Sequence, residues 1–236
     1  MLQAALEEHV TFFSGAIRLR GILSYPEQVR PEHAALLCSP HPHFAGDMNN
    51  NVICAVAQRL AARCAVLRFD YRGVGESEIA LGPDESAFDY WNAMEETKDY
   101  RDAVEDVCAA AGALLAATEP LDVGLSVVGY SFGAATGMLF ACRESRVQKM
   151  AAIAPPLGKV SFAFLADCHK PSLHLIGKND FLYSDESMAA FRQSVGPTAR
   201  ITVLNEVDHF FRGDEDSVAR QIEEYLLGTE GNQHGS

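Results

Sequence analysis

The sequence predicts an α/β fold, a mostly parallel sheet of about eight strands with helices on both faces. Short runs of β-branched and apolar residues alternate with segments in which apolar residues recur every three or four positions. This alternation is typical of parallel strands joined by helices. At 236 residues and 48% hydrophobic composition, the chain can bury one large core. We expect one domain over residues 1–228 and a disordered polar tail over residues 229–236.

Each predicted strand is a short apolar or β-branched run bounded by turn residues. Gly15 joins the first two runs as a hairpin, and most later runs are continuously apolar, which is typical of strands buried on both faces. The predicted strands cover residues 9–14, 16–25, 33–39, 64–71, 123–129, 147–154, 172–177 and 200–204.

Helices are predicted where apolar residues share one face, as Val52, Val56 and Leu60 do. The predicted helices cover residues 48–60, 100–115, 132–144, 185–195 and 218–226. Residues 79–97 contain Trp91, the single tryptophan, and are expected to be a surface connection packed down by its own aromatic side chains. The alternative is a flap that lines the substrate pocket.

Charge and cysteine usage exclude several classes of function. The formal net charge of −13 repels phosphate backbones and anionic lipid surfaces, and it disfavours highly anionic esters as substrates. The six cysteines show no C-x-x-C spacing, which fits a reduced interior. Glu7 and Glu8 stand where a signal peptide would need an apolar core, and no apolar run approaches the length of a membrane span. We expect a cytoplasmic monomer or homodimer that binds neither nucleic acid nor membranes.

The stretch Gly129-Tyr130-Ser131-Phe132-Gly133 lies between a predicted strand and a predicted helix. Glycines on both sides of a serine allow a tight turn in which larger side chains would clash, and the hydroxyl then projects from the end of the strand. This context favours a nucleophile elbow over an ordinary glycine-rich turn. Ser131 is therefore the candidate nucleophile.

A serine nucleophile requires a histidine base and an acid that orients the imidazole. The histidines that follow Ser131 are His169, His174, His209 and His234. His209 stands after the last predicted strand and before the last helix, where a loop can bring the ring to the elbow. It is the candidate base, and a histidine at a helix start is the alternative.

The acid should follow the strand before the one that precedes His209. Asp180 follows the apolar run that ends at Gly177, so it is the candidate acid, with ordinary turn chemistry as the alternative. Asp185 and Asp208 are its rivals. Asp208 is the weaker one, because a residue adjacent to His209 rarely folds back onto that ring.

Together these motifs resemble the α/β-hydrolase superfamily, and within it the small capless serine esterases related to dienelactone hydrolases. The resemblance also includes the stretches 69–77 and 39–48, the second being a His-Pro-bearing loop. It implies an α/β-hydrolase fold without a large cap domain and a carboxylic-ester hydrolase that needs no cofactor. One departure matters, since dienelactone hydrolases use cysteine where this chain has Ser131. That difference argues for carboxylic esters as substrates.

The family implies an oxyanion hole made of two backbone N–H groups. These are expected from Phe132 and from His43, with Phe44 as the fallback. His41, His43 and Asp47 could instead suggest a metal site, but their spacing lacks helical i, i+4 geometry and no metal is expected.

The substrate is expected to be a small or short-acyl ester bound in a pocket near Tyr130, Trp91 and Phe210. Arg72, in a glycine loop without a Lys-Ser/Thr ending, is expected to make structural hydrogen bonds and not to bind nucleotides. Two other functions stay open. They are a thioesterase or acyltransferase that uses the same three residues, and a non-catalytic binding protein on this fold.

Overall fold

The computed structural model describes residues 5–44 and 46–228, and the expected tail at 229–236 lies outside that part of the chain. The described residues form one eight-stranded sheet in the order β1-β2-β4-β3-β5-β6-β7-β8. The strands are β1 (Ala5–Ser14), β2 (Ile17–Pro26), β3 (His33–Cys38), β4 (Cys64–Asp70), β5 (Leu125–Tyr130), β6 (Val147–Ile153), β7 (Ser172–Gly177) and β8 (Ala199–Leu204). Only β2 runs antiparallel to its neighbours, so the predicted mostly parallel sheet of about eight strands is confirmed.

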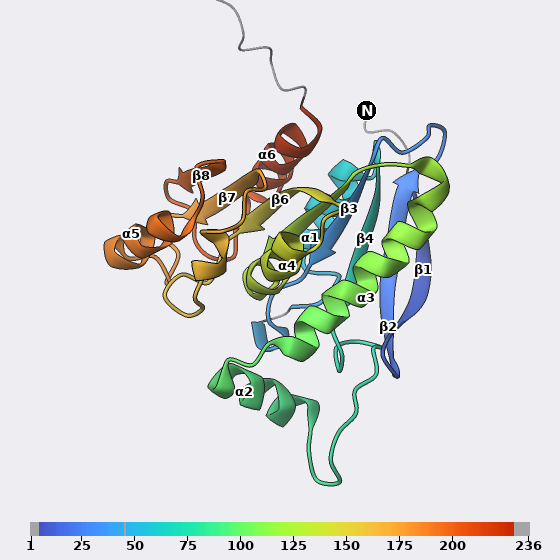
Figure 1. The fold of residues 1–236 in the computed structure, drawn as a ribbon, viewed down its shortest axis with the longest axis horizontal. Coiled ribbons are helices and arrows are strands. Elements are labelled where there is room, and N and C mark those ends of the chain that lie inside the picture. Colours follow the sequence, from blue (N-terminus) through green and yellow to red (C-terminus); the bar gives the residue numbers. More distant parts are fainter. Residues whose placement is uncertain (1–4, 45, 229–236) are drawn as a thin grey trace, which may run out of the picture.

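Helices cover both faces of this sheet (Figure 1). The α-helices of the described residues are α1 (Asn51–Leu60), α2 (Ala87–Thr97), α3 (Arg101–Thr118), α4 (Phe132–Arg143), α5 (Asp185–Ser194) and α6 (Glu215–Leu227). One core lies under α3 and α4, and a second core lies under α1 and α6. Along β3, Leu36 faces the first core and Leu37 the second, as the two-residue period of a strand requires.

Helix α2 is the main difference from the sequence prediction, which expected a connection over residues 79–97. Ser86 caps the helix by accepting a hydrogen bond from the N–H of Asp89, and the Asp89 carboxylate bonds back to Ser86. The helix ends at Lys98, which adopts the left-handed conformation with φ 56°. Trp91 is buried and fixes α2 against the body of the protein.

The first strand also begins earlier than predicted, at Ala5 and not at His9. Its first residues are exposed, so they carry no apolar pattern, and pairing with β2 defines the strand. Other element ends differ from the prediction by only a few residues. Asn50, for example, caps α1 through its side-chain oxygen, so that helix begins at Asn51 and not at Met48.

The connection between β6 and β7 contains one 3₁₀ turn, Ala163–Leu165, and no cap domain, as expected. The carboxyl ends of the central strands are therefore open on this side. No helix in residues 5–44 and 46–228 combines the length and apolar character that a membrane crossing needs.

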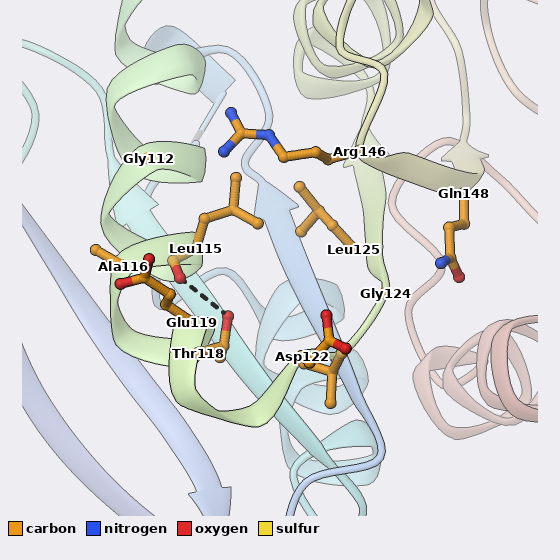
Figure 2. A pocket seen from close by; sticks show the side chains of 11 residues that line it. Gly112, Leu115, Ala116, Thr118, Glu119, Asp122, Gly124, Leu125, Arg146 and Gln148 are labelled. Carbon is orange, nitrogen blue, oxygen red and sulfur yellow. Dashed lines mark hydrogen bonds between the residues drawn. The ribbon is translucent and has the colours of Figure 1, made fainter.

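A cavity of about 610 Å³ lies away from those carboxyl ends (Figure 2). It opens between the last turns of α3 and the beginnings of β5 and β6, where Leu115, Leu125 and Gln148 line it. No histidine, cysteine or serine lines it. The candidate site is at the other end of the sheet.

Candidate active site

Ser131 stands at a sharp turn between β5 and α4, as the sequence predicts. Its backbone has φ 52° and ψ −115°, a conformation that non-glycine residues rarely adopt. A Cβ atom on Gly133 would lie 2.1 Å from the carbonyl oxygen of Cys38, and one on Gly129 would lie 2.1 Å from the carbonyl oxygen of Gly133. Only glycine fits at these two positions, so the turn can bring α4 close to the sheet.

A chain of two hydrogen bonds joins the three residues selected from the sequence. Ser131 Oγ lies 3.0 Å from His209 Nε2, and His209 Nδ1 lies 2.7 Å from Asp180 Oδ2. His209 and Asp180 are each 5% exposed. The other carboxylate oxygen, Oδ1, accepts from the N–H of Leu182 at 2.8 Å, so both oxygens of Asp180 are engaged. With the imidazole proton on Nδ1, Nε2 is free to accept the serine hydroxyl.

The loops after β7 and β8 hold Asp180 and His209 together. The N–H of Asn179 donates to the carbonyl of Val207 at 2.9 Å. Gly177 packs so closely that a Cβ atom there would lie 2.4 Å from the same carbonyl oxygen. The hydroxyl of buried Tyr130 donates to the carbonyl of His209 at 2.8 Å. These contacts fix the imidazole over the elbow.

The alternative residues for the acid and the base bond to other groups. Asp208 Oδ1 accepts from the N–H groups of Phe210 and Phe211, at 2.8 and 3.1 Å, and so closes a turn. Asp185 is exposed and pairs with Lys178 at 3.5 Å. His174 is buried in β7 against Ser172, with 2.9 Å between Nε2 and Oγ.

The loop after β3 carries the expected oxyanion donors in the 3₁₀ turn Pro42–Phe44. The N–H of Phe44 donates to the carbonyl of His41 at 2.8 Å and closes that turn. The N–H of His43 donates at 3.2 Å to the ring nitrogen Nδ1 of His41, a longer hydrogen bond that does not close the backbone turn. This difference favours His43 over Phe44 as the second donor. Phe132 begins α4, where the first N–H groups have no partner within the helix.

From the sequence, His41 was considered only as a possible metal ligand, and the structure gives it a different position in the site. Its ring is 5% exposed and contacts Phe132 and Trp91 edge to face, with centroids 5.2 and 5.4 Å away. Burial lowers the pKa of His41 to about 4, so the ring stays neutral at neutral pH and Nδ1 remains an acceptor. The proton is then on Nε2, which has no hydrogen-bond partner and lies 3.6 Å from Glu95 Oε1.

A cavity of about 390 Å³ opens at Ser131 and His209. Its wall includes residues from α2 and from the β6–β7 connection, such as Glu95, Lys98 and Lys159. Residues 79–97 therefore border the cavity, which the sequence analysis treated as the alternative, and they do so as a helix.

The three residues predicted for the substrate pocket do not line this cavity. Tyr130 is buried beneath the His209 loop, and Trp91 is 1% exposed behind His41 and Phe132. Phe210 packs edge to face on His209, with 5.6 Å between centroids, outside the cavity lining. Tyr130 and Phe210 are next to Ser131 and His209 along the chain, but that proximity does not fix the direction of a side chain. Trp91 belongs to a segment that does border the cavity, but its own side chain points into the core.

Four exposed phenylalanines line the cavity or pack on residues that line it, and they are here called the aromatic rim: Phe44, Phe88, Phe181 and Phe210, exposed by 63%, 61%, 64% and 37%. Phe88 stacks on His43 with 4.4 Å between centroids, and Phe181 lies 4.8 Å from the ring of His209. Exposed aromatic side chains gathered at one place mark a surface that contacts apolar groups.

Arg72 and Asp47, which were also considered from the sequence, make structural hydrogen bonds. Arg72 is buried and bonds to Asp106 of α3, with 2.7 Å between Nη2 and Oδ1, which confirms its structural role. Asp47 Oδ1 accepts from the N–H of Asn49 at 2.7 Å. Within the described ranges, no group of three or more His, Cys, Asp or Glu residues is arranged to hold a metal ion.

A parallel sheet that presents a serine on a strained turn between a central strand and a helix defines the α/β-hydrolase fold. Residues 38–227 match the sequence model of the alpha/beta hydrolase family, so the chain belongs to this family. An uncharacterized protein of Rickettsia prowazekii (strain Madrid E) is 30% identical over 211 residues, covering 85% of this chain and 81% of that protein.

Solved structures are similar over nearly the whole chain. A protein of unknown function from Agrobacterium tumefaciens has a TM-score of 0.75 and 26% identity, covering 93% of this chain and 94% of its own. A serine hydrolase without lid from Xanthomonas campestris has a TM-score of 0.72 and 21% identity, covering 97% of this chain and 99% of its own. The second likeness supports the capless fold.

Proposed function

We propose that this protein is a serine hydrolase that cleaves small or short-acyl carboxylic esters through an acyl-enzyme. The observation that carries the proposal is the hydrogen-bonded chain from Ser131 through His209 to Asp180, with distances of 3.0 and 2.7 Å. Membership of the alpha/beta hydrolase family supports hydrolysis as the reaction type. The cavity at Ser131, about 390 Å³, is large enough for a small ester.

In this mechanism Ser131 Oγ attacks the ester carbonyl while His209 Nε2 accepts the hydroxyl proton. The carboxylate of Asp180 keeps the other imidazole proton on Nδ1 and stabilises the imidazolium. His209 then gives the proton to the departing alkoxide, which leaves as an alcohol. Water then attacks the acyl-enzyme while His209 accepts its proton. His209 returns this proton to Ser131 Oγ as the carboxylic acid leaves, and the free serine is regenerated.

The oxyanion of each tetrahedral intermediate would accept from the N–H groups of Phe132 and His43. In the structure His43 donates at 3.2 Å to His41 Nδ1, a long bond to a neutral ring. The developing negative charge is the stronger acceptor, because hydrogen bonds to an ionised group are about twice as strong. We assign His41 the role of holding this N–H in place until the charge forms.

Two experiments test the proposal. A fluorophosphonate probe should label the wild-type protein on the peptide that contains Ser131, and Ser131→Ala should remove both labelling and hydrolysis of 4-nitrophenyl acetate. Ser126→Ala is the matched control, because Ser126 lies in the same strand, buried against His33. It should keep the labelling.

Labelling at another residue, or full activity of Ser131→Ala, would contradict the proposal. The same assay with acyl thioesters separates an esterase from a thioesterase. A non-catalytic binding protein would show neither labelling nor turnover with any of these compounds.

A further inference from the structure

A second cavity, about 340 Å³, adjoins the one that contains Ser131. Lys98, Lys159 and Val160 line both, so the two cavities meet at these residues. The floor of the second cavity comes from helix α4, where Ala135 and Leu139 are one turn apart. At 1.5 Å per residue, these positions lie roughly 6 and 12 Å along the helix from Ser131. A bound substrate could therefore react at Ser131 and extend into the second cavity.

The charge of this cavity is opposite to that of the whole protein. The chain carries a formal net charge of −13. Two of the nine residues that line the second cavity are lysines, and none of the nine is Asp or Glu. A carboxylate is the natural partner of such a surface, whereas the field of the whole chain works against more highly charged anions.

The two lysines differ in how far their charge is already compensated. Lys98 Nζ lies 2.7 Å from Glu95 Oε2, which also raises the pKa of that ammonium group. Among the described residues, Lys159 makes no ion pair within 4 Å. Lys159 is thus the cation available to a ligand, and Lys98 supplies a weaker second contribution.

Apolar and hydroxyl-bearing side chains complete the cavity. Leu139, Val160 and Phe164 suit a hydrocarbon segment, and Ser161 can donate a hydrogen bond to an anion. Because Lys98 and Lys159 lie where the two cavities meet, the arrangement matches a ligand with a reactive carbonyl at Ser131 and a single negative charge a short apolar chain away, at this junction.

We propose that Lys159, assisted by Lys98, binds a carboxylate of the substrate, and that the substrate class is the monoester of a short dicarboxylic acid. This inference rests on the proposed function for its chemistry, because Ser131 would attack the ester carbonyl. The lysines determine specificity and take no part in bond making.

The test compares two esters of equal chain length, the 4-nitrophenyl monoester of adipic acid and 4-nitrophenyl hexanoate. The first ends in a carboxylate and the second in a methyl group. Wild-type kcat/KM should favour the adipic monoester, and Lys159→Gln should lower that value roughly five- to tenfold while changing the hexanoate value less than twofold. Lys98→Gln should have a smaller effect. Arg200→Gln is the control, since it removes one exposed positive charge that lines neither cavity.

A binding measurement separates this inference from the proposed function. Ser131→Ala should bind adipic acid monomethyl ester in a calorimeter more tightly than methyl hexanoate, and adding Lys159→Gln should abolish the difference. If the wild type cleaves neither chromogenic ester but this binding difference is present, the proposed function fails and the subsite stands. If both esters are cleaved equally and Lys159→Gln changes neither the rates nor the binding, the subsite is wrong and the hydrolase remains.

Discussion

Ser131 combines the hydroxyl that we propose as the nucleophile with a strained backbone, and the two properties can be separated by substitution. A non-glycine residue in such a conformation costs about 1–3 kcal/mol, and glycine loses part of this gain, about 0.5–1 kcal/mol, through the flexibility of the unfolded chain. We expect Ser131→Gly to be about 1 kcal/mol more stable than Ser131→Ala in urea denaturation, with both variants inactive. Equal stabilities would mean that the turn is not strained at φ 52°.

Asp180 and Asp208 should respond differently to substitution by asparagine. Asp180→Asn leaves the shape of the acid but removes the charge that orients His209, so kcat should fall by about 10⁴-fold with little change in stability. Asp208→Asn should retain most of the activity, because its carboxylate bonds to backbone N–H groups and not to the ring. Steady-state kinetics on 4-nitrophenyl acetate checks both. If the rates come out reversed, the assignment of Asp180 as the acid is wrong.

Residues that follow strands in a fixed order could be selected from the sequence, and residues that line the cavity could not. Ser131, Asp180 and His209 each follow an apolar strand, so the fold determines their positions. Lys98 and Lys159 reach the cavity because a left-handed helix end and a loop turn toward it. No local pattern of residue types encodes those directions.

At the scale of elements, the buried pair of Arg72 and Asp106 joins the loop after β4 to α3. Asp106 is fully buried and accepts from both the side chain and the backbone N–H of Arg72. Without Asp106, the closest carboxylate left to Arg72 is that of the partly exposed Asp102, 2.8 Å from Nη1, so Asp106→Ala should cost about 3 kcal/mol of unfolding free energy, the low end for breaking a buried pair. Glu105→Ala is the control, because exposed Glu105 lies 3.8 Å from the same guanidinium and should cost about 0.5 kcal/mol or less. Equal losses in urea denaturation would contradict this account.

Helix α2 shows why one element escaped prediction while the others did not. Its start signal, Ser86 with Asp89 three residues later, is present in the sequence. However, only Trp91 and Met94 of its residues are buried, and two buried positions make too weak a helical pattern beside a cluster of aromatic residues. Helix α5 also buries only two residues, Met188 and Phe191, but it lies between two predicted strands, where the alternation of strands and helices calls for a helix. Helix α2 is followed by another helix, α3, so this alternation does not predict it.

At the scale of the whole molecule, buried titratable groups make stability depend on pH. Burial lowers the pKa of His33, His41 and His174 to about 4, whereas an unfolded histidine titrates near 6.5. Between these values the unfolded chain binds protons that the folded protein does not. Burial also raises the pKa of Asp70 from 3.8 to about 6, which has the opposite effect over most of the same range.

Near pH 5 the three histidines each take up about one proton on unfolding, and Asp70 releases about one, so the net uptake is about two protons. The free energy of unfolding should therefore fall as the pH falls from about 6.5 to 4, by roughly 2.7 kcal/mol per pH unit at the steepest point. Urea denaturation at several pH values measures this slope. His174→Gln should reduce the slope by about half, and a slope that is flat or reversed in the wild type would contradict the prediction.

The short connection between β6 and β7 has a consequence for the fate of the acyl-enzyme that we propose. Because no cap excludes solvent, water and any added alcohol should reach this intermediate equally well, and neither should be favoured by the site. We expect product partitioning to show no more methyl ester than the concentration of methanol and its intrinsic nucleophilicity relative to water account for, as calibrated by the uncatalysed solvolysis of the same ester. A stronger diversion would indicate a pocket selective for an alcohol, and the chain would then be a transferase that tolerates water.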